Sequence, residues 1–260
     1  MRIINTKVKV GIILFEYDIF VQGFPGKSPT HGGLGWSSIA LLSQNDQNII
    51  IDVGSFGVRK LLFQKLHEKG LTPNDITMVL LTHTHWDHSV NWNLFPNATI
   101  VVGEVDMNWA LNEPTGHSDV PELYIKELDR SPQKRLVGHL EEIVPGIVAH
   151  QTKGHTPGHL AYSVDNGDFD IIFSGDAAKN RAELLSRNVD MTLSLSDSLD
   201  SIDYLWNLWR KKKDNIMVPG HDIPMKLVDG KPVYLQKREA ELQCWFSDNL
   251  EDLTDVKLVD

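Results

Sequence analysis

Short apolar runs alternate along this chain with segments in which apolar residues recur every three or four positions. Short runs with β-branched members are typical of buried strands, and the longer spacing is typical of helices with one buried face. We expect strands at residues 8–15, 39–42, 49–53, 77–81, 99–102, 146–151, 160–164, 170–173 and 216–218. We expect helices at 58–69, from 104 onward, from 196 onward and at 233–250. Because no linker or repeat interrupts this alternation, it predicts an α/β fold in one domain over residues 1–260.

A segment rich in glycine and proline separates the first two expected strands. Residues 23–35 contain five glycines and two prolines, a density that marks a loop with special backbone angles. A long loop inside a compact domain is more often functional than accidental. The segment is therefore a candidate lip over a binding cleft.

Composition limits the partners and the location of the protein. Hydrophobic residues make up 41% and charged residues 23%, as in ordinary globular proteins. A net charge of −10 argues against a nucleic-acid partner. Lys7 and Lys9 interrupt the apolar region that a signal peptide would need, and no uncharged apolar stretch approaches the about 20 residues that span a bilayer. We expect a cytoplasmic protein that binds neither nucleic acid nor membrane, without an intrachain disulfide because Cys244 is the only cysteine.

Four candidate metal ligands lie within six residues, directly after an expected buried strand: His83, His85, Asp87 and His88. Neutral imidazole and carboxylate are ligands that zinc and similar divalent ions favour. A helix would point these side chains in different directions, so we expect an irregular turn. A polar loop without a shared task is the alternative, and the ordered spacing disfavours it.

Three later candidates repeat one design. His155, Asp176 and His221 each follow a glycine close to the end of an expected strand. Each alone is weak evidence. Together they are what we expect when loops at one edge of a sheet build a site.

The string His83-Thr84-His85-Trp86-Asp87-His88 resembles the HxHxDH signature of the metallo-β-lactamase superfamily. The pairs Gly154-His155, Gly175-Asp176 and Gly220-His221 match the remaining motifs of that family in the correct order. The match extends from Asp52 to His221. This resemblance implies a four-layer αββα sandwich, with two metal ions at one edge of two packed sheets.

The resemblance also implies a role for each ligand. His83, His85 and His155 would bind the first metal, Asp87, His88 and His221 the second, and Asp176 would bridge both. Asp52 would orient the ligand loop through hydrogen bonds. A strand-end aspartate without that task is the alternative for Asp52.

These ligands imply a hydrolase. Two divalent ions that share one water lower its pKa from about 15.7 toward about 7, and the bridging hydroxide attacks a carbonyl carbon polarised by one metal. Asp87 is suited to orient the nucleophile or to pass a proton to the leaving group. We expect zinc, although manganese, iron and cobalt accept the same ligands. His85 stands where similarity to the flavo-diiron branch would require glutamate, which disfavours redox chemistry.

Within the superfamily the chain is most similar to the N-acyl-homoserine lactonase branch and its pyridoxolactonase-like relatives. Motifs at 94–98, 155–159 and 219–222 carry this similarity. Lactonases of this branch have a tyrosine three positions after the bridging aspartate, where this chain has Lys179. Lys179 could donate to a carbonyl, bind a substrate carboxylate, or be a solvated loop residue. We expect an enzyme that opens a carbonyl ester of a small molecule, in the first place a lactone ring.

Three other functions stay open. Trp86-Asp87-His88-Ser89 is similar to a string in glyoxalase II, a thioesterase, but few residues follow His221 to form the helical glutathione-binding region of that family. A mononuclear iron sulfur dioxygenase shares much of the motif without needing the whole set for the second metal. A non-catalytic member that only binds a ligand is the third alternative.

Four aromatic residues are weak candidates for a substrate pocket, together with Lys179: Phe24, Trp36, Trp92 and Tyr124. Aromatic residues more often belong to a core or an interface. Trp206 and Trp209 lie on the apolar face of an expected helix and are assigned to the core or to a dimer contact, so a homodimer stays open. His159 is expected to support the turn at His155.

Overall fold

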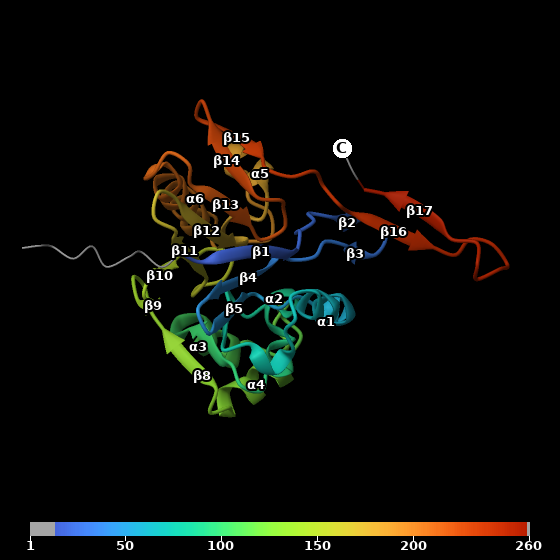
Figure 1. Cartoon of the computed structure of the whole chain (residues 1–260), viewed down its shortest axis with the longest axis horizontal. Helices are drawn as coiled ribbons and strands as arrows, with labels where there is room; N and C mark the ends of the chain where they lie inside the picture. The colour runs from blue at the N-terminus through green and yellow to red at the C-terminus, as the bar shows by residue number, and fades with distance from the viewer. Residues whose placement is uncertain (1–13, 259–260) are drawn as a thin grey trace, which may run out of the picture.

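The structure is a computed structural model, and it describes residues 14–258. Its strands form two large sheets that face each other, with helices on the two outer sides (Figure 1). The first sheet has the order β1-β4-β5-β6-β7-β8, antiparallel as far as β5 and parallel from β5 to β8. Its strands are β1 (Glu16–Val21), β4 (Ile39–Gln44), β5 (Gln47–Ile51), β6 (Met78–Leu80), β7 (Thr99–Gly103) and β8 (Lys134–Val137).

The second sheet has the order β15-β14-β13-β12-β11-β10-β9, and only its β12–β13 pair is parallel. Its strands are β9 (Glu142–Val144), β10 (Ile147–Gln151), β11 (Leu160–Asp165), β12 (Asp170–Gly175), β13 (Ile216–Pro219), β14 (Met225–Val228) and β15 (Lys231–Tyr234). Two small hairpins stand apart from the sheets: β2 (Lys27–Ser28) with β3 (Gly32–Gly33), and β16 (Glu241–Cys244) with β17 (Thr254–Lys257).

Six α-helices complete the described part of the chain. They are α1 (Arg59–Glu68), α2 (Trp86–Ser89), α3 (Glu104–Asn112), α4 (Glu122–Arg130), α5 (Arg181–Ser186) and α6 (Leu195–Arg210). Helix α6 begins after Ser194, whose hydroxyl caps the helix by accepting from the backbone N–H of Asp197. Within residues 14–258, no helix has the length and apolar character that crossing a membrane requires.

Side-chain alternation along the strands explains the layers. In the first sheet, Ile50, Val79 and Ile100 point to a core shared with α1, α3 and α4, whereas Leu80 and Val101 point to the second sheet. The core between the two sheets takes its other half from β10, β11, β12 and β13. A third core lies between the outer face of the second sheet and α6, around the buried Trp209. The three cores separate four layers, which confirms the expected αββα arrangement.

Most expected elements are present with shifts of a few residues, but two regions differ. The strand expected at 8–15 lies outside the described residues except for Leu14 and Phe15, which precede β1. The helix expected at 233–250 is wrong, because the chain there forms the end of β15, a loop and then β16. Its apolar residues, including Phe246 and Leu250, stay exposed, so no packed face stabilises a helix. Helix α4 was not expected. Pro114 and Gly116 precede it in a polar stretch whose composition is typical of a loop.

Candidate metal centre

The first ligand loop follows β6, and a buried aspartate holds it in place. Asp52 accepts three hydrogen bonds, each of 2.8 Å: one from the Thr82 backbone N–H, one from the Thr82 hydroxyl and one from Nδ1 of His88. Because Nδ1 of His88 contacts this carboxylate, its Nε2 faces the site and is the atom available to a metal ion. That Nε2 lies 3.2 Å from Asp176 Oδ1. Asp52 therefore makes the contacts that an orienting residue needs.

The other ligands leave the second sheet where β10, β12 and β13 end. His155 lies in the turn after β10, where its Nδ1 donates to the Met191 carbonyl at 2.7 Å and its Nε2 is directed to the other ligands. Glycine is required before it, because a Cβ at Gly154 would lie 2.3 Å from the Ser198 hydroxyl, in addition to a φ of +135°. Asp176 follows β12, and His221 follows β13.

The structure brings all seven predicted ligands to one place. Donor atoms within each of three groups lie within 4.8 Å of one another. The groups are His83 with His85 and His155, His83 with His88 and Asp176, and Asp87 with His88 and His221. Asp176 lies between the sets, with Oδ2 3.4 Å from His155 Nε2 and Oδ1 3.3 Å from His221 Nε2.

Burial and charge divide these histidines into two kinds. Burial and the neighbouring histidines hold the pKa of His83 well below its usual range, and burial does the same for His155, where it outweighs the attraction of Asp176. For His88, burial opposes the charged form, but Asp87, Asp176 and Asp52 outweigh it and raise its pKa well above the usual value. Burial also opposes the charged form of Asp176, but His221, His88 and His155 outweigh it and lower the Asp176 pKa.

The donor atoms fit divalent metal ions. Nε2 of His83 is buried and has no hydrogen-bond partner within residues 14–258. His85 Nδ1 and His155 Nε2 are only 2.9 Å apart. The N–H of the neutral His155 ring is at Nδ1, where it donates to the Met191 carbonyl, so its Nε2 has a lone pair to offer. A cation that accepts three nitrogen lone pairs satisfies all three atoms, and an imidazole and carboxylate set is typical of zinc and related ions.

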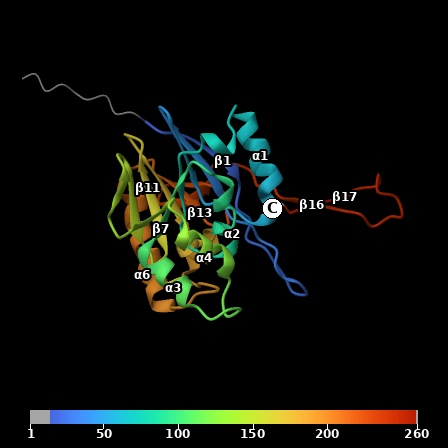
Figure 2. The ribbon, with the colours of Figure 1, turned by 90° about the horizontal axis from the view of Figure 1, so that it is seen from below.

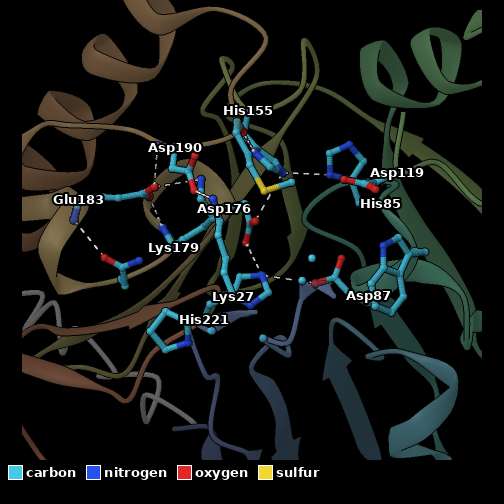
Figure 3. Close-up of a pocket in the computed structure, with 18 of the residues that line it drawn as sticks. Lys27, His85, Asp87, Asp119, His155, Asp176, Lys179, Glu183, Asp190 and His221 are labelled. Carbon is cyan, nitrogen blue, oxygen red and sulfur yellow. Dashed lines mark hydrogen bonds and ion pairs between the residues drawn. The ribbon is translucent and has the colours of Figure 1, made fainter. Parts of the chain in front are cut away.

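A cavity of about 700 Å³ opens over this cluster. Figure 3 shows Asp176 and His155 near its centre, with His85 and Asp87 on one side and Lys179 on the other. Glycines 26, 32, 33 and 35 of the β2–β3 segment line the cavity, so the glycine-rich segment lies at the site as expected. Lys27 of that segment forms an ion pair with Asp190 at the opposite wall.

Lys179 is buried at the cavity wall and is not a solvated loop lysine. It is 9% exposed, and its Nζ lies 3.1 Å from Glu183 Oε1. Glu183 also accepts from the backbone N–H of Lys179 at 2.8 Å and from that of Asp190 at 3.2 Å. The lysine is therefore fixed three residues after Asp176 and faces the same cavity.

Comparison with known proteins agrees with this geometry. The family described as "Metallo-beta-lactamase superfamily" matches residues 32–221. The chain belongs to this superfamily. It is accordingly a metal-dependent hydrolase of the metallo-β-lactamase fold, and this family uses divalent metals at such His/Asp clusters.

Relatives in the superfamily include hydrolases with a described substrate class. A probable metallo-hydrolase of Methanocaldococcus jannaschii is 30% identical over 67% of this chain and 70% of its own length. An N-acyl homoserine lactonase of Bacillus thuringiensis is 29% identical over 61% of this chain, and the match spans 60% of the lactonase. A solved structure of a mutant of B. thuringiensis AiiA, with N-decanoyl-L-homoserine at the active site, has a TM-score of 0.64 at 20% identity and covers 81% of this chain and 93% of that one. That likeness concerns the fold.

The four aromatic candidates do not line the cavity over the candidate metal centre. Trp92 is 4% exposed in the core beneath α4, where its Nε1 donates to the Tyr124 carbonyl at 3.2 Å. Tyr124 packs against Phe56 at a ring distance of 5.4 Å. Phe24 and Trp36 stack on each other at 4.7 Å and pair across the base of the glycine-rich segment. None of the four lines the cavity, because their rings pack in the other contacts described here.

Asp106 positions two ligand loops and is not identified from the sequence, whereas His159, which is, makes one more contact than expected. Asp106, buried at the start of α3, accepts from the Thr84 backbone N–H at 2.7 Å and from the Thr156 hydroxyl, and so joins the two ligand loops. His159 contacts the loop before His155 through its Nδ1, 2.9 Å from the Thr152 hydroxyl, and its Nε2 also accepts from the Asp176 backbone N–H at 2.9 Å. In the sequence, Asp106 is indistinguishable from any acidic residue in a first helical turn.

Proposed function

We propose that this protein is a dinuclear metal-dependent hydrolase that opens a carbonyl ester, most directly a lactone ring. One observation carries the proposal. The Asp176 carboxylate has one oxygen directed to the three-histidine group and the other to His88 and His221. A carboxylate between two donor sets is the arrangement that supports a pair of cations.

In this proposal His83, His85 and His155 hold one ion, Asp87, His88 and His221 hold the other, and Asp176 bridges them. Zinc is the proposed metal because three neutral imidazoles and a carboxylate suit it. Such a pair, when bound, lowers the pKa of a shared water and polarises a carbonyl oxygen. The remaining chemistry belongs to side chains of the protein.

Asp87 is the proposed proton carrier. Its carboxylate lines the cavity, and its Oδ2 lies 3.4 Å from His221 Nε2. The Ser37 hydroxyl donates to the Asp87 backbone carbonyl at 2.5 Å and so fixes the residue in the short helix α2. From this position a carboxylate oxygen can take a proton from the attacking water and pass it to the alkoxide that leaves when the ring opens.

Lys179 is the proposed contact for an oxygen of the substrate, either the carbonyl or a carboxylate. It occupies the position at which the similar lactonases have tyrosine. The wall beside Lys179 carries charged groups, namely the Lys179–Glu183 pair and the Lys27–Asp190 pair, whereas Trp86 and Met191 add apolar surface elsewhere in the cavity. The charged part suits the polar end of a lactone or ester.

The proposal is tested by metal analysis of the purified protein together with hydrolysis assays on lactones, esters, thioesters and β-lactams. About two equivalents of zinc with lactone turnover are expected. Turnover of thioesters alone would identify the glyoxalase II type of activity. One equivalent of iron with oxygen consumption would identify a dioxygenase, and full metal occupancy without turnover would identify a binding protein.

Asp176→Ala should lose most of the bound metal and the activity while its circular dichroism spectrum is retained. The matched control is Asp168→Ala, which changes an exposed aspartate of a turn and should keep both properties. Wild-type metal content in Asp176→Ala would contradict the bridging role.

Lys179→Met tests the substrate contact. We expect a loss of kcat/KM of about 10- to 100-fold for a carboxylate-bearing lactone and a smaller loss for a neutral one, because only the former needs the cation. Lys179→Arg should recover part of the activity. Equal losses on both substrates, together with reduced metal content, would assign Lys179 a structural role.

A further inference from the structure

The chain extends from the body of the molecule in a hairpin, residues 241–257, that we call the arm. Strands β16 and β17 pair with each other from Glu241–Lys257 to Cys244–Thr254 and belong to neither large sheet. Figures 1 and 2 both show the arm projecting away from the two sheets. An isolated two-stranded hairpin is at best marginally stable in water, so the arm needs a surface that covers it.

The arm exposes large apolar side chains. The exposed fractions are 55% for Trp245, 76% for Phe246, 81% for Leu250, 46% for Leu253 and 38% for Val256. Apolar groups gathered in this way on a projecting element are typical of a contact with another protein. Aromatic residues in particular are enriched at the centres of such contacts.

The charge of the arm limits the choice of partner. It contains five carboxylates and a single lysine, Lys257; the acidic residues are Glu241, Asp248, Glu251, Asp252 and Asp255. Anionic lipid headgroups and phosphate backbones would be repelled. Two arms paired edge to edge would also repel each other. The matching surface must be apolar and basic.

The segment 56–69 of the same protein has this character. Phe56, Leu61 and Phe63 are exposed by 49%, 38% and 41%. The segment has four basic residues other than histidine: Arg59, Lys60, Lys65 and Lys69. Lys65 and Lys69 pair with Glu68 and Asp18, so Arg59 and Lys60 are the cations without an ion pair inside residues 14–258. The Arg59 guanidinium lies over the Phe56 ring at 4.6 Å, so charge and apolar surface are adjacent.

The position of this segment suits a closed dimer. In Figures 1 and 2, α1 lies on the side of the molecule from which the arm extends, whereas α6 lies on the opposite side. In a two-fold dimer the arm of one copy reaches the partner, and the arm of the partner reaches back to the same side of the first copy. The surface of α1, which lies on the side from which the arm extends, can therefore be covered by the arm of the partner in each copy.

We propose that the arm of one copy packs on the 56–69 segment of a second copy, and the reverse, so that the protein is a two-fold homodimer with two equal arm contacts. Trp245 and Phe246 cover the apolar side chains of α1. The acidic residues of the arm face the cations of that segment. High salt should therefore weaken the dimer, in addition to any effect of dilution.

Two double variants test both sides of the contact by analytical ultracentrifugation of the full chain. The arm variant is Trp245→Ser with Phe246→Ser, and the helix variant is Leu61→Ser with Phe63→Ser. All four side chains are exposed, so the fold should persist, and circular dichroism checks this. Each variant alone has neither arm contact and should sediment as a monomer, whereas the wild type sediments as a dimer.

Mixing the two variants gives the decisive result. In a mixed pair, the intact arm of the helix variant meets the intact helix of the arm variant, so one of the two contacts is restored. We expect dimers in the mixture at concentrations where each variant alone is monomeric. The control, Leu123→Ser with Leu140→Ser, removes two exposed leucines elsewhere and should stay dimeric.

Four outcomes would overturn the proposal. A monomeric wild type would remove the dimer itself. A dimeric arm variant would show that the arm is not the interface. A monomeric arm variant beside a dimeric helix variant, or a mixture that stays monomeric, would show that the arm does not dock on the 56–69 segment.

Discussion

Imidazole groups at the candidate centre are oriented by hydrogen bonds on the side away from the cavity. His88 donates to Asp52, and His155 donates to the Met191 carbonyl. Each of these bonds fixes the orientation of the ring and leaves its Nε2 directed at the site. The precision of the centre therefore depends on residues that do not bind the metal.

Asp52→Asn should weaken metal binding by about 10- to 100-fold, because an amide replaces one acceptor oxygen by a donor and cannot serve Thr82 and His88 together. Metal affinity is measured by titration of the metal-free protein with a competing chelator. Asp46→Asn, at an exposed turn, is the control. Unchanged affinity in Asp52→Asn would show that the carboxylate does not orient the loop.

His150, a buried histidine outside the candidate ligand set, gives the protein a pH dependence of its stability. Its ring nitrogens contact the Tyr204 hydroxyl and the Ser163 hydroxyl, each at 2.8 Å. Burial, helped by His139 and Lys211, lowers its pKa from 6.5 to about 4. Between these pH values His150 is protonated in the unfolded chain but not in the folded chain. The free energy of unfolding therefore falls as the pH falls from 6.5 toward 4.

His150→Gln should therefore lose less stability than the wild type when urea unfolding is compared at pH 7.5 and about pH 5. Other titrating groups act in both proteins and cancel in this difference. His67→Gln, at an exposed position of α1, should behave as the wild type. Equal pH sensitivity of His150→Gln and the wild type would contradict the assignment.

Among the elements, the β2–β3 hairpin depends on glycine for its position over the cavity. A Cβ at Gly35 would lie 2.5 Å from the Phe24 carbonyl oxygen, within the bridge between Phe24 and Trp36. Backbone on both sides of this contact must move to admit a side chain. At Gly33, by contrast, a Cβ would meet nothing within 4 Å.

Gly35→Ala should lower kcat/KM by about tenfold or more, because a displaced hairpin changes the wall against which the substrate is held. Gly33→Ala also adds a methyl group at the cavity wall and should have little effect. Steady-state kinetics on the substrate found by the hydrolysis assays measures both. Similar kcat/KM values for Gly35→Ala and Gly33→Ala would show that catalysis does not depend on the position of the hairpin.

In the whole molecule, the candidate centre joins the two sheets. His83, His85 and His88 come from the loop after β6 of the first sheet, whereas His155, Asp176 and His221 come from the second. Cations held by both sets would cross-link the layers. Because they bind the folded chain in preference to the unfolded chain, they should stabilise it.

Removal of metal by a chelator should lower Tm by about 5–10 °C. A ligand at 100 times its Kd contributes about 2.7 kcal/mol, and 1 kcal/mol corresponds to about 2–4 °C in a protein of this size. Differential scanning calorimetry with and without chelator measures the shift, and restored zinc should reverse it. A protein whose metal is removed without a change in Tm would contradict the cross-link.

The sequence alone determined the candidate ligands, because metal binding needs particular donor atoms at particular spacings: His83, His85, Asp87 and His88, then His155, Asp176 and His221. It also determined most strands of the layered fold, since buried strands need apolar runs. Only the tertiary structure decided that Lys179 is buried, that Trp92 belongs to the core and that Asp106 joins two loops. It also decided that residues 241–257 form a hairpin, because the helical composition of that segment had no packed surface to support it. The burial and the long-range contacts of a side chain depend on which elements pack together in the fold. The local pattern of apolar and polar residues in the sequence does not contain that information.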